Sequence, residues 1–425
     1  MAIQSVRGTR DILGEDYLKY QHLNQRAFEI LPLYGYQGIE TPLFESTALF
    51  QRGLGETSDI VSKEMYTFPD RNNELLTLRP EGTASVARAI LQAGLTQTLP
   101  QKLFYTGPMF RYERPQKGRY RQFYSLGIEC IGLAHPLADV ECIALGDHLL
   151  KAWGITDYQL NINTLGDSES RALYRQALID YFIPYKENLS KDSQIRLEKN
   201  PLRILDSKDP NDQILCSKAP IFSHYLNETS KTFFDQLQEG LTKLKIDFVL
   251  NPKLVRGIDY YCHTAFEFKT ELLGSQDAIL AGGRYDGLMQ KLGGPALPAI
   301  GWGCGLDRIM LLLSSFQPQQ NLKIGLIAVE EEFYSIALEL SQNLRRNNII
   351  CEVPLNGNLS KKMKYVDKIN CDLAILIGPE EYSQQQVKVR YLKKSIENAV
   401  DNSWNKETSV SLTKLLDYIS SFKKD

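Results

Sequence analysis

Two apolar and aromatic segments, residues 102–113 and 121–132, flank a polar and basic stretch from Arg114 to Tyr120. Both segments are rich in Tyr, Phe, Leu and Ile, a composition typical of β-strands. Two such segments joined by a short connection predict a β-hairpin with a charged loop. An antiparallel sheet is therefore expected around this part of the chain.

Helical patterns occur both before and after the hairpin. Residues 17–31 have apolar groups at helical spacing, and the extended piece Ile39 to Phe44 contains Pro42, which suggests an edge strand or a bulge. Residues 168–248 are mostly helical in pattern, with Lys- and Asp-rich turns. We expect them to form a domain inserted between the hairpin and later Gly-rich strands.

From Lys323 onward, strand-like and helix-like segments alternate. The strands KIGLIAV, IICEVP and DLAILIG are separated by two amphipathic helices, the second over residues 359–370. This order predicts a small α/β domain. The stretch from Ser314 to Asn321, with Pro318 and three Gln, is the expected linker.

Composition excludes several classes of protein. The chain has 425 residues, a net charge of −2 and seven Cys without a CxxC pair, so two or three domains are expected and neither a disulfide framework nor a zinc knuckle is indicated. No apolar run is long enough to span a bilayer. We expect a cytoplasmic protein with reduced thiols and no membrane partner.

Common catalytic motifs are missing. No Gly-Lys pair occurs, which excludes a Walker-type phosphate loop, and GWGCGLDR has Leu306 where the dinucleotide fingerprint requires glycine. HExxH and GxSxG are absent as well. The chemistry must therefore be carried by other residues.

Arginines next to glycines and aromatic residues form the strongest chemical pattern: Arg111, Arg256, Arg284 and Arg308. The planar guanidinium suits anionic oxygens. When a carboxylate attacks the α-phosphorus of ATP, two anions must approach each other, and fixed cations stabilise the charge that develops. The pattern predicts an enzyme that activates a carboxylic acid with ATP.

Side-chain alternation along the hairpin groups residues that suit this reaction. Arg111 and Glu113 are predicted to share one face of the first strand. The second strand presents four residues on one face: Phe123, Ser125, Gly127 and Glu129. Phe123 can stack on an adenine, while the small Ser125 and Gly127 leave room for a ligand above the sheet.

The segment LLTLRPEGT suggests an amino acid as the acid. The strand period places Glu81 beside Thr83, where both can accept protons from an ammonium group. The alternative is structural: Thr83 caps a helix that begins at Ala84, and Glu81 favours the dipole of the same helix.

These segments together resemble the histidyl-tRNA synthetases of the class II aminoacyl-tRNA synthetases, over nearly the whole length. Motif 1 corresponds to residues around 38–46 with Pro42, motif 2 to 102–132, and motif 3 to 299–313 with GWGCGLDRI. The segments LVRGIDYY (254–261) and AGGRYDGL (281–288) resemble those that mark histidine specificity.

The resemblance implies an α+β fold with an antiparallel sheet flanked by helices. It implies a catalytic domain over residues 1–320, interrupted by the helical insertion at 168–248, and an α/β anticodon-binding domain over 322–425. A homodimer is implied, with Pro42 at its interface. The implied substrates are ATP with Mg²⁺, L-histidine and tRNA(His), with no tightly bound organic cofactor.

The resemblance also implies the roles of individual residues. The catalytic residues are Arg111 and Arg256. The ATP-binding residues are Arg111, Glu113, Arg119, Phe123 and Arg308. The histidine-binding residues are Glu81, Thr83, Arg111, Ser125, Glu129, Arg256, Tyr260, Tyr261 and Tyr285. The hairpin loop contacts tRNA through Arg114, Gln116 and Arg119. No carboxylate is assigned to the metal, and Glu113 is only a candidate.

The sequence departs from the family pattern at a few positions. Ser125 replaces the glutamine that usually helps bind the substrate amino group. His263 and Ala265 replace the commoner Arg and Val, and Asp307 stands where Glu is frequent. The effect on histidine binding is expected at Ser125 above all.

Other interpretations stay open at this point. The main one is a histidine-sensing paralogue that serves as the regulatory subunit of ATP phosphoribosyltransferase, and a second is an RNA-binding or sensor module. Single residues also have structural interpretations. Arg284 alone suggests a surface ion pair, only one of Tyr260 and Tyr261 can face a pocket from a strand, and three lysines suggest a solvated helix face: Lys361, Lys362 and Lys364.

Overall fold

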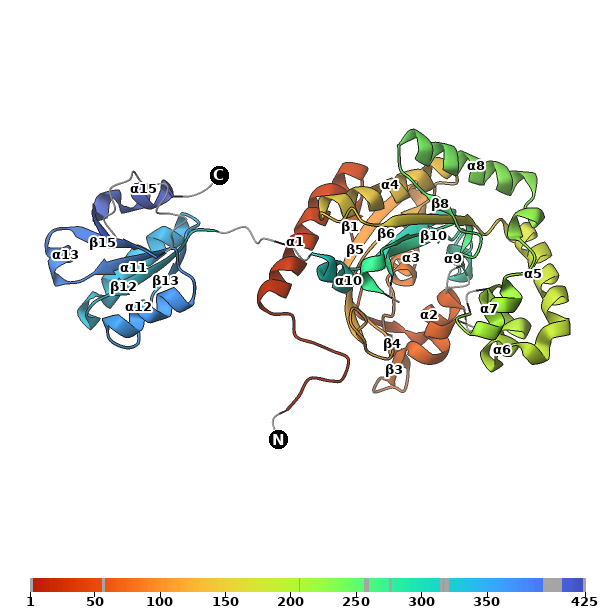
Figure 1. Cartoon of the computed structure of the whole chain (residues 1–425), viewed down its shortest axis with the longest axis horizontal. Helices are drawn as coiled ribbons and strands as arrows, with labels where there is room; N and C mark the ends of the chain where they lie inside the picture. Colours follow the sequence, from red (N-terminus) through yellow and green to blue (C-terminus); the bar gives the residue numbers. More distant parts are fainter. Residues whose placement is uncertain are drawn as a thin grey trace. The chain divides into compact units, whose positions relative to one another are not determined.

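The computed structural model describes residues 3–55, 58–205, 207–255, 260–274, 277–313, 316, 321–392 and 407–422. The chain forms two compact units, Met1–Phe316 and Gln317–Asp425 (Figure 1). Arg256 and most of the expected linker, Ser314 to Asn321, lie outside the described residues.

An eight-stranded sheet forms the centre of the first unit. Its strands, in spatial order, are β1 (Gln37–Gly38), β5 (Gln101–Phe110), β6 (Gln122–Ile131), β11 (Ala299–Gly305), β10 (Ala278–Arg284), β9 (Cys262–Lys269), β7 (Gln159–Thr164) and β8 (Val249–Leu250). All neighbours pair antiparallel except at the two edges, where β1 and β8 run parallel to β5 and β7. The predicted α+β fold with an antiparallel sheet is confirmed.

The predicted hairpin is formed by β5 and β6, with Phe104 opposite Ile128. Its strands are shorter than expected, because β5 ends at Phe110 and β6 begins at Gln122. The backbone N–H of Arg111 still donates to Arg121 (2.9 Å), but that of Glu113 turns back to Arg111 (2.9 Å). Strand alternation therefore does not apply to Glu113, contrary to expectation.

Helices cover both faces of this sheet. On one face, α1 (Gly14–Ile30) and α4 (Pro136–Ala152) bury Leu23, Ala27, Leu145 and Leu149 against strand residues such as Ile128. On the other face lie α2 (Thr47–Leu54), α3 (Thr83–Gln92) and α9 (Leu288–Lys291). The sheet has two cores as a result, and a site facing α3 is separated from α1 and α4 by the strands.

A second, three-stranded sheet lies beside α2. It consists of β2 (Phe44–Ser46), β4 (Leu75–Leu78) and β3 (Tyr66–Pro69), and η2 (Ile60–Glu64) directly precedes β3. The extended piece expected from Ile39 forms a strand only at Phe44. Pro42 lies in the connection between β1 and β2, not in an edge strand or a bulge.

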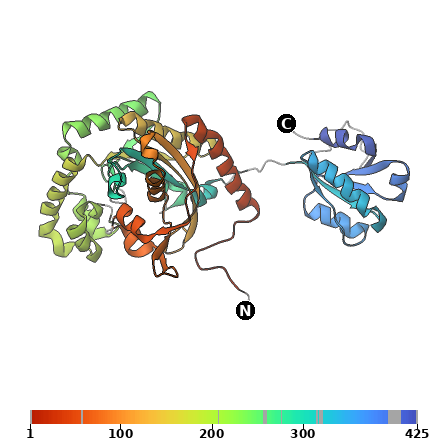
Figure 2. The same ribbon diagram turned by 180° about the vertical axis from the view of Figure 1, so that it is seen from behind.

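The segment expected as a helical insertion consists of short helices: α5 (Ser168–Phe182), η4 (Ile183–Asn188), α6 (Lys191–Lys199), η5 (Pro201–Ile204), α7 (Pro210–Cys216), η6 (Phe222–Tyr225) and α8 (Glu228–Lys243). Those from α5 to η6 have a core of their own, which includes Tyr174, Phe182 and Ile204. Helix α8 differs, because its Leu237 and Leu241 belong to the core beneath α4. Figure 2 shows α5 to α7 at the edge of the unit, with α8 running back over it.

The second unit has a five-stranded sheet in the order β13 (Ile350–Glu352), β12 (Lys323–Ala328), β14 (Leu373–Ile377), β15 (Gln386–Tyr391) and β16 (Glu407–Ser411). The first three strands are parallel and alternate with α11 (Tyr334–Arg346) and α12 (Leu359–Lys368), as predicted. The antiparallel β15 and β16 and the short α13 (Pro379–Ser383) and α15 (Leu415–Ser420) are additions that the sequence did not indicate.

One lysine of α12 contradicts the expected solvated face. Lys361 and Lys364 are exposed, but Lys362 is only 2% exposed. Its Nζ donates to the carbonyl of Ala328 (2.7 Å) and lies 4.7 Å from the centre of the Tyr334 ring. The carbonyl and the ring face satisfy a charge that the helix pattern alone would place in water.

Candidate active site

A pocket opens on the α3 side of the large sheet, among the hairpin, the start of α3 and strands β10 and β11. It encloses about 1190 Å³ of empty space, its open mouth included. Eleven of the residues predicted for the site line it: Glu81, Thr83, Arg111, Glu113, Arg119, Phe123, Ser125, Tyr260, Tyr261, Tyr285 and Arg308.

The other predicted residues lie elsewhere. Glu129 is buried directly behind the pocket wall, only 1% exposed. Arg114 and Gln116 are exposed on the hairpin loop. Arg256 is outside the described residues, so its place in the site stays a prediction.

Glu129 receives hydrogen bonds from three hydroxyl groups. Thr83 donates to Oε1 (2.6 Å), Tyr105 donates to the same oxygen (3.2 Å), and Tyr285 donates to Oε2. Burial raises the pKa of Glu129 to about 8, although the bonds from Thr83 and Tyr285 oppose that rise. At neutral pH this carboxyl group can therefore hold or release a proton.

Glu81 caps the first turn of α3. Its Oε2 accepts from the backbone N–H of Thr83 (2.8 Å), and its Oε1 accepts from that of Ala84 (2.8 Å). The strand period proposed for this segment is wrong, because β4 ends at Leu78 and Thr83 already begins the helix. Capping is the structural alternative, but Glu81 performs it instead of Thr83. Burial also raises the pKa of Glu81.

Tyr105 is a site residue that sequence reasoning missed. A Cβ atom at Gly127 would lie 2.3 Å from the Tyr105 ring, and one at Gly82 would lie 2.2 Å from it. The space expected for a ligand beside Gly127 is thus filled by this tyrosine. The hairpin register could have revealed it, because Tyr105 stands directly opposite Gly127.

Tyr260 and Tyr261 both line the pocket, against the expectation that only one could. Strand alternation does not apply to them, because β9 begins at Cys262. The guanidinium of Arg171, on α5, donates to the carbonyl of Tyr261 (2.6 Å). The helical segment thus holds the backbone of one pocket residue.

Three arginines give the pocket its positive charge. Arg111 donates from Nε to the carbonyl of Pro80 (2.9 Å), Arg308 donates to that of Ala278 (2.7 Å), and Arg119 pairs with Glu113. Burial lowers the pKa of all three, and at Arg308 the charges of Arg119 and Arg111 lower it further. A buried anion such as a triphosphate would relieve this repulsion.

Two further hairpin side chains, Phe123 and Ser125, line the pocket. The guanidinium of Arg111 is 5.5 Å from the centre of the Phe123 ring. The hydroxyl of Ser125 donates to the carbonyl of Cys304 (3.2 Å), across to β11. Ser125 therefore presents a small surface to the pocket while its proton is engaged.

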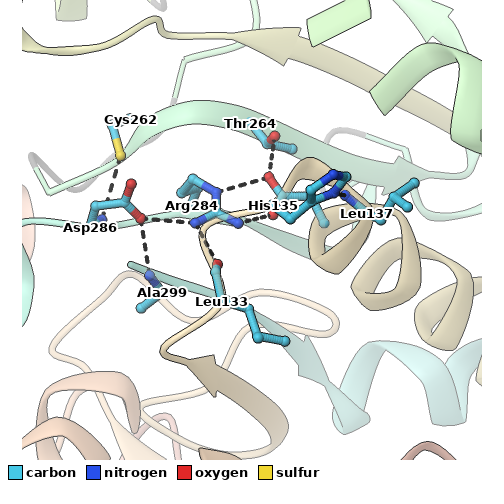
Figure 3. A network of polar contacts seen from close by, with 9 residues as sticks. Leu133, His135, Leu137, Cys262, Thr264, Arg284, Asp286 and Ala299 are labelled. Atoms are coloured by element: carbon cyan, nitrogen blue, oxygen red, sulfur yellow. Dashed lines mark hydrogen bonds and ion pairs between the residues drawn. The ribbon is translucent and has the colours of Figure 1, made fainter. Parts of the chain in front are cut away.

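Arg284 is not part of the pocket, although the sequence grouped it with the other arginines. It is completely buried and donates from Nε to Asp139 (3.1 Å), which also accepts from Thr264. Figure 3 shows Arg284 and Thr264 in this network of polar contacts. Burial opposes the charge of Arg284, but Asp139 outweighs it and raises the pKa of the guanidinium. The expected surface ion pair is a buried one, and it fixes the end of β10 just before Tyr285.

Among the described residues, no group of three or more His, Cys, Asp or Glu side chains could hold a metal ion. All seven cysteines lie in the described part of the chain and none forms a disulfide. No described helix is long and apolar enough to cross a membrane.

Comparison with known proteins identifies the two units. Residues 8–170 and 203–309 match the family described as histidyl-tRNA synthetase, and residues 323–421 match an anticodon binding domain. A histidine–tRNA ligase of Gluconacetobacter diazotrophicus is 50% identical over 392 residues, which cover 92% of this chain and 94% of the relative. That of Wolbachia pipientis is 47% identical over 391 residues, covering 92% and 95%.

Solved structures agree. Apo histidyl-tRNA synthetase of S. aureus has a TM-score of 0.82 and 32% identity, covering 98% of this chain and 100% of that one. A structure from Bacillus halodurans, described as an ATP phosphoribosyltransferase regulatory subunit/histidyl-tRNA synthetase, has a TM-score of 0.66 and 23% identity, covering 89% and 99%. At that identity the second likeness concerns the fold alone.

Proposed function

Because this chain belongs to the histidyl-tRNA synthetase family and is an ATP-dependent histidine–tRNA ligase, we propose that its pocket binds the ATP phosphates at Arg111, Arg119 and Arg308 and binds histidine beside Glu81 and Glu129. The observation that carries this assignment is the presence of both cations and carboxyl groups at one cavity. Three arginines and Glu81 line the cavity, and the buried carboxyl group of Glu129 lies directly behind its wall.

Activation of histidine joins two anions. A carboxylate oxygen of histidine attacks the α-phosphorus of ATP, the bond to the β-phosphate oxygen breaks, and pyrophosphate leaves. We assign Arg111 to the α-phosphate, Arg308 to the γ-phosphate and the adenine, and Arg256 to the substrate carboxylate. Phe123 packs against the adenine, and ATP enters with Mg²⁺ as part of the substrate complex. Fixed cations lower the barrier because they need not reorganise as charge shifts between oxygens.

Recognition of histidine is proposed to use the carboxyl, hydroxyl and tyrosine groups of the site. We assign Glu81 and Thr83 to the α-amino group, and Glu129 with Tyr261 and Tyr285 to the imidazole, next to Tyr260. A carboxylate accepts an imidazole N–H, which an apolar amino acid of similar size cannot offer. The hydroxyl of Ser125 donates to the carbonyl of Cys304, and this small side chain leaves room for a water molecule next to the amino group.

Transfer to tRNA is the second step. The terminal hydroxyl of tRNA(His) attacks the carbonyl carbon of histidyl-adenylate, and AMP leaves. We assign Arg114 and Gln116, which are exposed, and Arg119 to contact with the acceptor end. The unit over residues 322–425 would read the anticodon, while residues 1–320, including the helical insertion at 168–248, carry the chemistry.

The working form is proposed to be a cytoplasmic homodimer. Phe44 and Phe68 are 52% and 41% exposed on β2 and β3, an unusual position for large apolar rings. These strands follow Pro42, where the family resemblance places the dimer interface.

The test is histidine-dependent exchange of labelled pyrophosphate into ATP. Arg111→Ala is expected to lower exchange by at least about a hundredfold while the melting temperature changes little, because it removes a cation at the reacting phosphate. Arg175→Ala, an exposed arginine on the outer side of α5, is the matched control and should match wild type. Exchange by Arg111→Ala at the wild-type rate would refute the phosphate assignment.

A further inference from the structure

The chain begins with an extended arm, residues 3–13, that has no helix or strand and precedes α1 (Figures 1 and 2). Most of the arm is exposed, yet it is bonded to the end of the hairpin loop. The backbone N–H of Arg121 donates to the carbonyl of Gly8 (2.7 Å), and the Arg121 guanidinium donates to the carbonyl of Arg7 (3.4 Å).

Gly8 makes this close approach possible. Its φ of +89° is in the left-handed region, and a Cβ atom there would lie 2.8 Å from Cγ of Arg121 and 2.9 Å from Cγ of Pro115. Any other residue would therefore push the arm away from the loop.

Arg10 carries the contact toward the pocket. Its Nη2 donates to Oδ1 of Asp307 (2.8 Å), and its Nη1 donates to the more exposed Asp16 (2.9 Å). The guanidinium lies 4.7 Å from the centre of the Tyr120 ring, at the end of the hairpin loop. Arg10 thus touches both the loop and the carboxylate next to Arg308.

Asp307 connects three segments. It is 3% exposed and lines the pocket, and its Oδ2 accepts from the backbone N–H of Tyr124 (2.7 Å) at the start of β6. The next residue, Arg308, approaches the carbonyl of Gly118 in the loop with its Nε (3.4 Å). The arm, the start of β6 and the start of α10 (Leu306–Leu312) therefore meet at one buried carboxylate.

We propose that the N-terminal arm is a positioning element of the ATP site, in which Arg10, acting through Asp307, holds Arg308 and the hairpin loop in the arrangement that receives the triphosphate. The need for it follows from the pocket charge. Arg111, Arg119 and Arg308 repel one another before ATP binds. In the empty pocket this repulsion tends to move the hairpin loop away from Arg308. The arm opposes this with a charge-assisted pair and a backbone bond placed away from the ligand. The inference rests on the proposed placement of the ATP phosphates at Arg111, Arg119 and Arg308.

The first test compares Arg10→Ala, Arg10→Lys and Asp16→Asn in the full-length protein. A lost charge-assisted pair is worth enough to raise the KM for ATP about tenfold in pyrophosphate exchange. The dissociation constant for histidine should stay within about twofold of wild type, because Arg10 pairs with Asp16 and Asp307 and not with Glu81 or Glu129. Arg10→Lys should recover part of the ATP affinity. Asp16→Asn should match wild type, since it leaves the bond to Asp307 intact.

Gly8→Ala tests the same idea with every charge in place. It should reproduce the ATP-selective defect by displacing the arm from Pro115 and Arg121. An unchanged KM for ATP in folded Arg10→Ala and Gly8→Ala proteins would overturn the proposal. So would equal losses for ATP and histidine, which would mark general destabilisation. If Arg111→Ala also exchanged normally, the ATP placement itself would fail, and that failure is distinct from failure of the arm alone.

Discussion

At the scale of the residue, the pocket depends on Glu129, a carboxyl group with almost no solvent contact. Three hydroxyl donors surround it, and burial still raises its pKa to about 8. A group in this position can take up a proton in the empty pocket and lose it when an imidazole N–H offers a better partner. Under the proposed role of Glu129, its ionisation links substrate recognition with stability.

The stability of the catalytic unit should carry this signature. The folded protein holds the Glu129 proton from about its unfolded pKa of 4.5 up to about 8, so the contribution is fully present below the first value and is lost as pH rises through the second. Relative to Glu129→Gln, wild type should lose free energy of unfolding at up to roughly 1.4 kcal/mol per unit of pH in this window. Melting curves of both proteins from pH 5.5 to 9 measure the difference. Parallel pH profiles would contradict the assignment.

At the scale of the element, the sequence predicts segments better than it predicts where they end. The hairpin was evident from its two aromatic segments, but its second strand begins only at Gln122, after Arg121 has bonded to Gly8, more than a hundred residues earlier. No local pattern contains that partner. The same holds for Arg284, whose buried partner Asp139 lies on α4, and for Lys362, whose environment exists only once β12 has formed.

Tyr105 is a different case, because the hairpin register alone places it opposite Gly127. The site residues were found chiefly through motifs, which mark residue types in order. The errors at Glu81, Tyr260 and Tyr261 share one cause: each lies just outside a strand, where the two-residue period no longer applies.

The helices between α5 and η6 depend on one buried carboxylate. Asp212 accepts hydrogen bonds from the hydroxyls of Ser190 (2.7 Å), Ser193 (2.6 Å) and Ser207 (2.6 Å), which tie together three turns of chain. Asp212→Ala should destabilise this segment by about 2–4 kcal/mol, because it leaves three hydroxyl donors, two of them buried, without their acceptor. Limited proteolysis within residues 168–226 and thermal melting measure the effect.

Ser193→Ala is the graded control for Asp212, since it removes one donor and should cost only about 1 kcal/mol. Burial alone would raise the pKa of Asp212, but its donors outweigh burial and lower it. The stabilisation is therefore present above the unfolded pKa and is lost as pH falls through the folded one. Equal protease resistance of wild type and Asp212→Ala would show that the hydrogen bonds to Asp212 are not needed to stabilise this segment.

At the scale of the whole molecule, the exposed face of the three-stranded sheet should form the contact between two copies of the chain. Cross-strand pairing puts Phe44 opposite Leu78, with Tyr66 beyond it, and puts Phe68 on the same face. On the opposite face Thr77 is buried, and its hydroxyl bonds those of Thr47, on α2, and Thr67, both at 2.9 Å. Phe44→Asp combined with Phe68→Asp should give a monomer in light scattering, because each charge would be buried unpaired in the interface. Ile214→Asp changes an apolar residue on α7 that is even more exposed, at 63%, and should stay dimeric. A dimeric Phe44→Asp/Phe68→Asp protein would place the subunit contact elsewhere on the molecule.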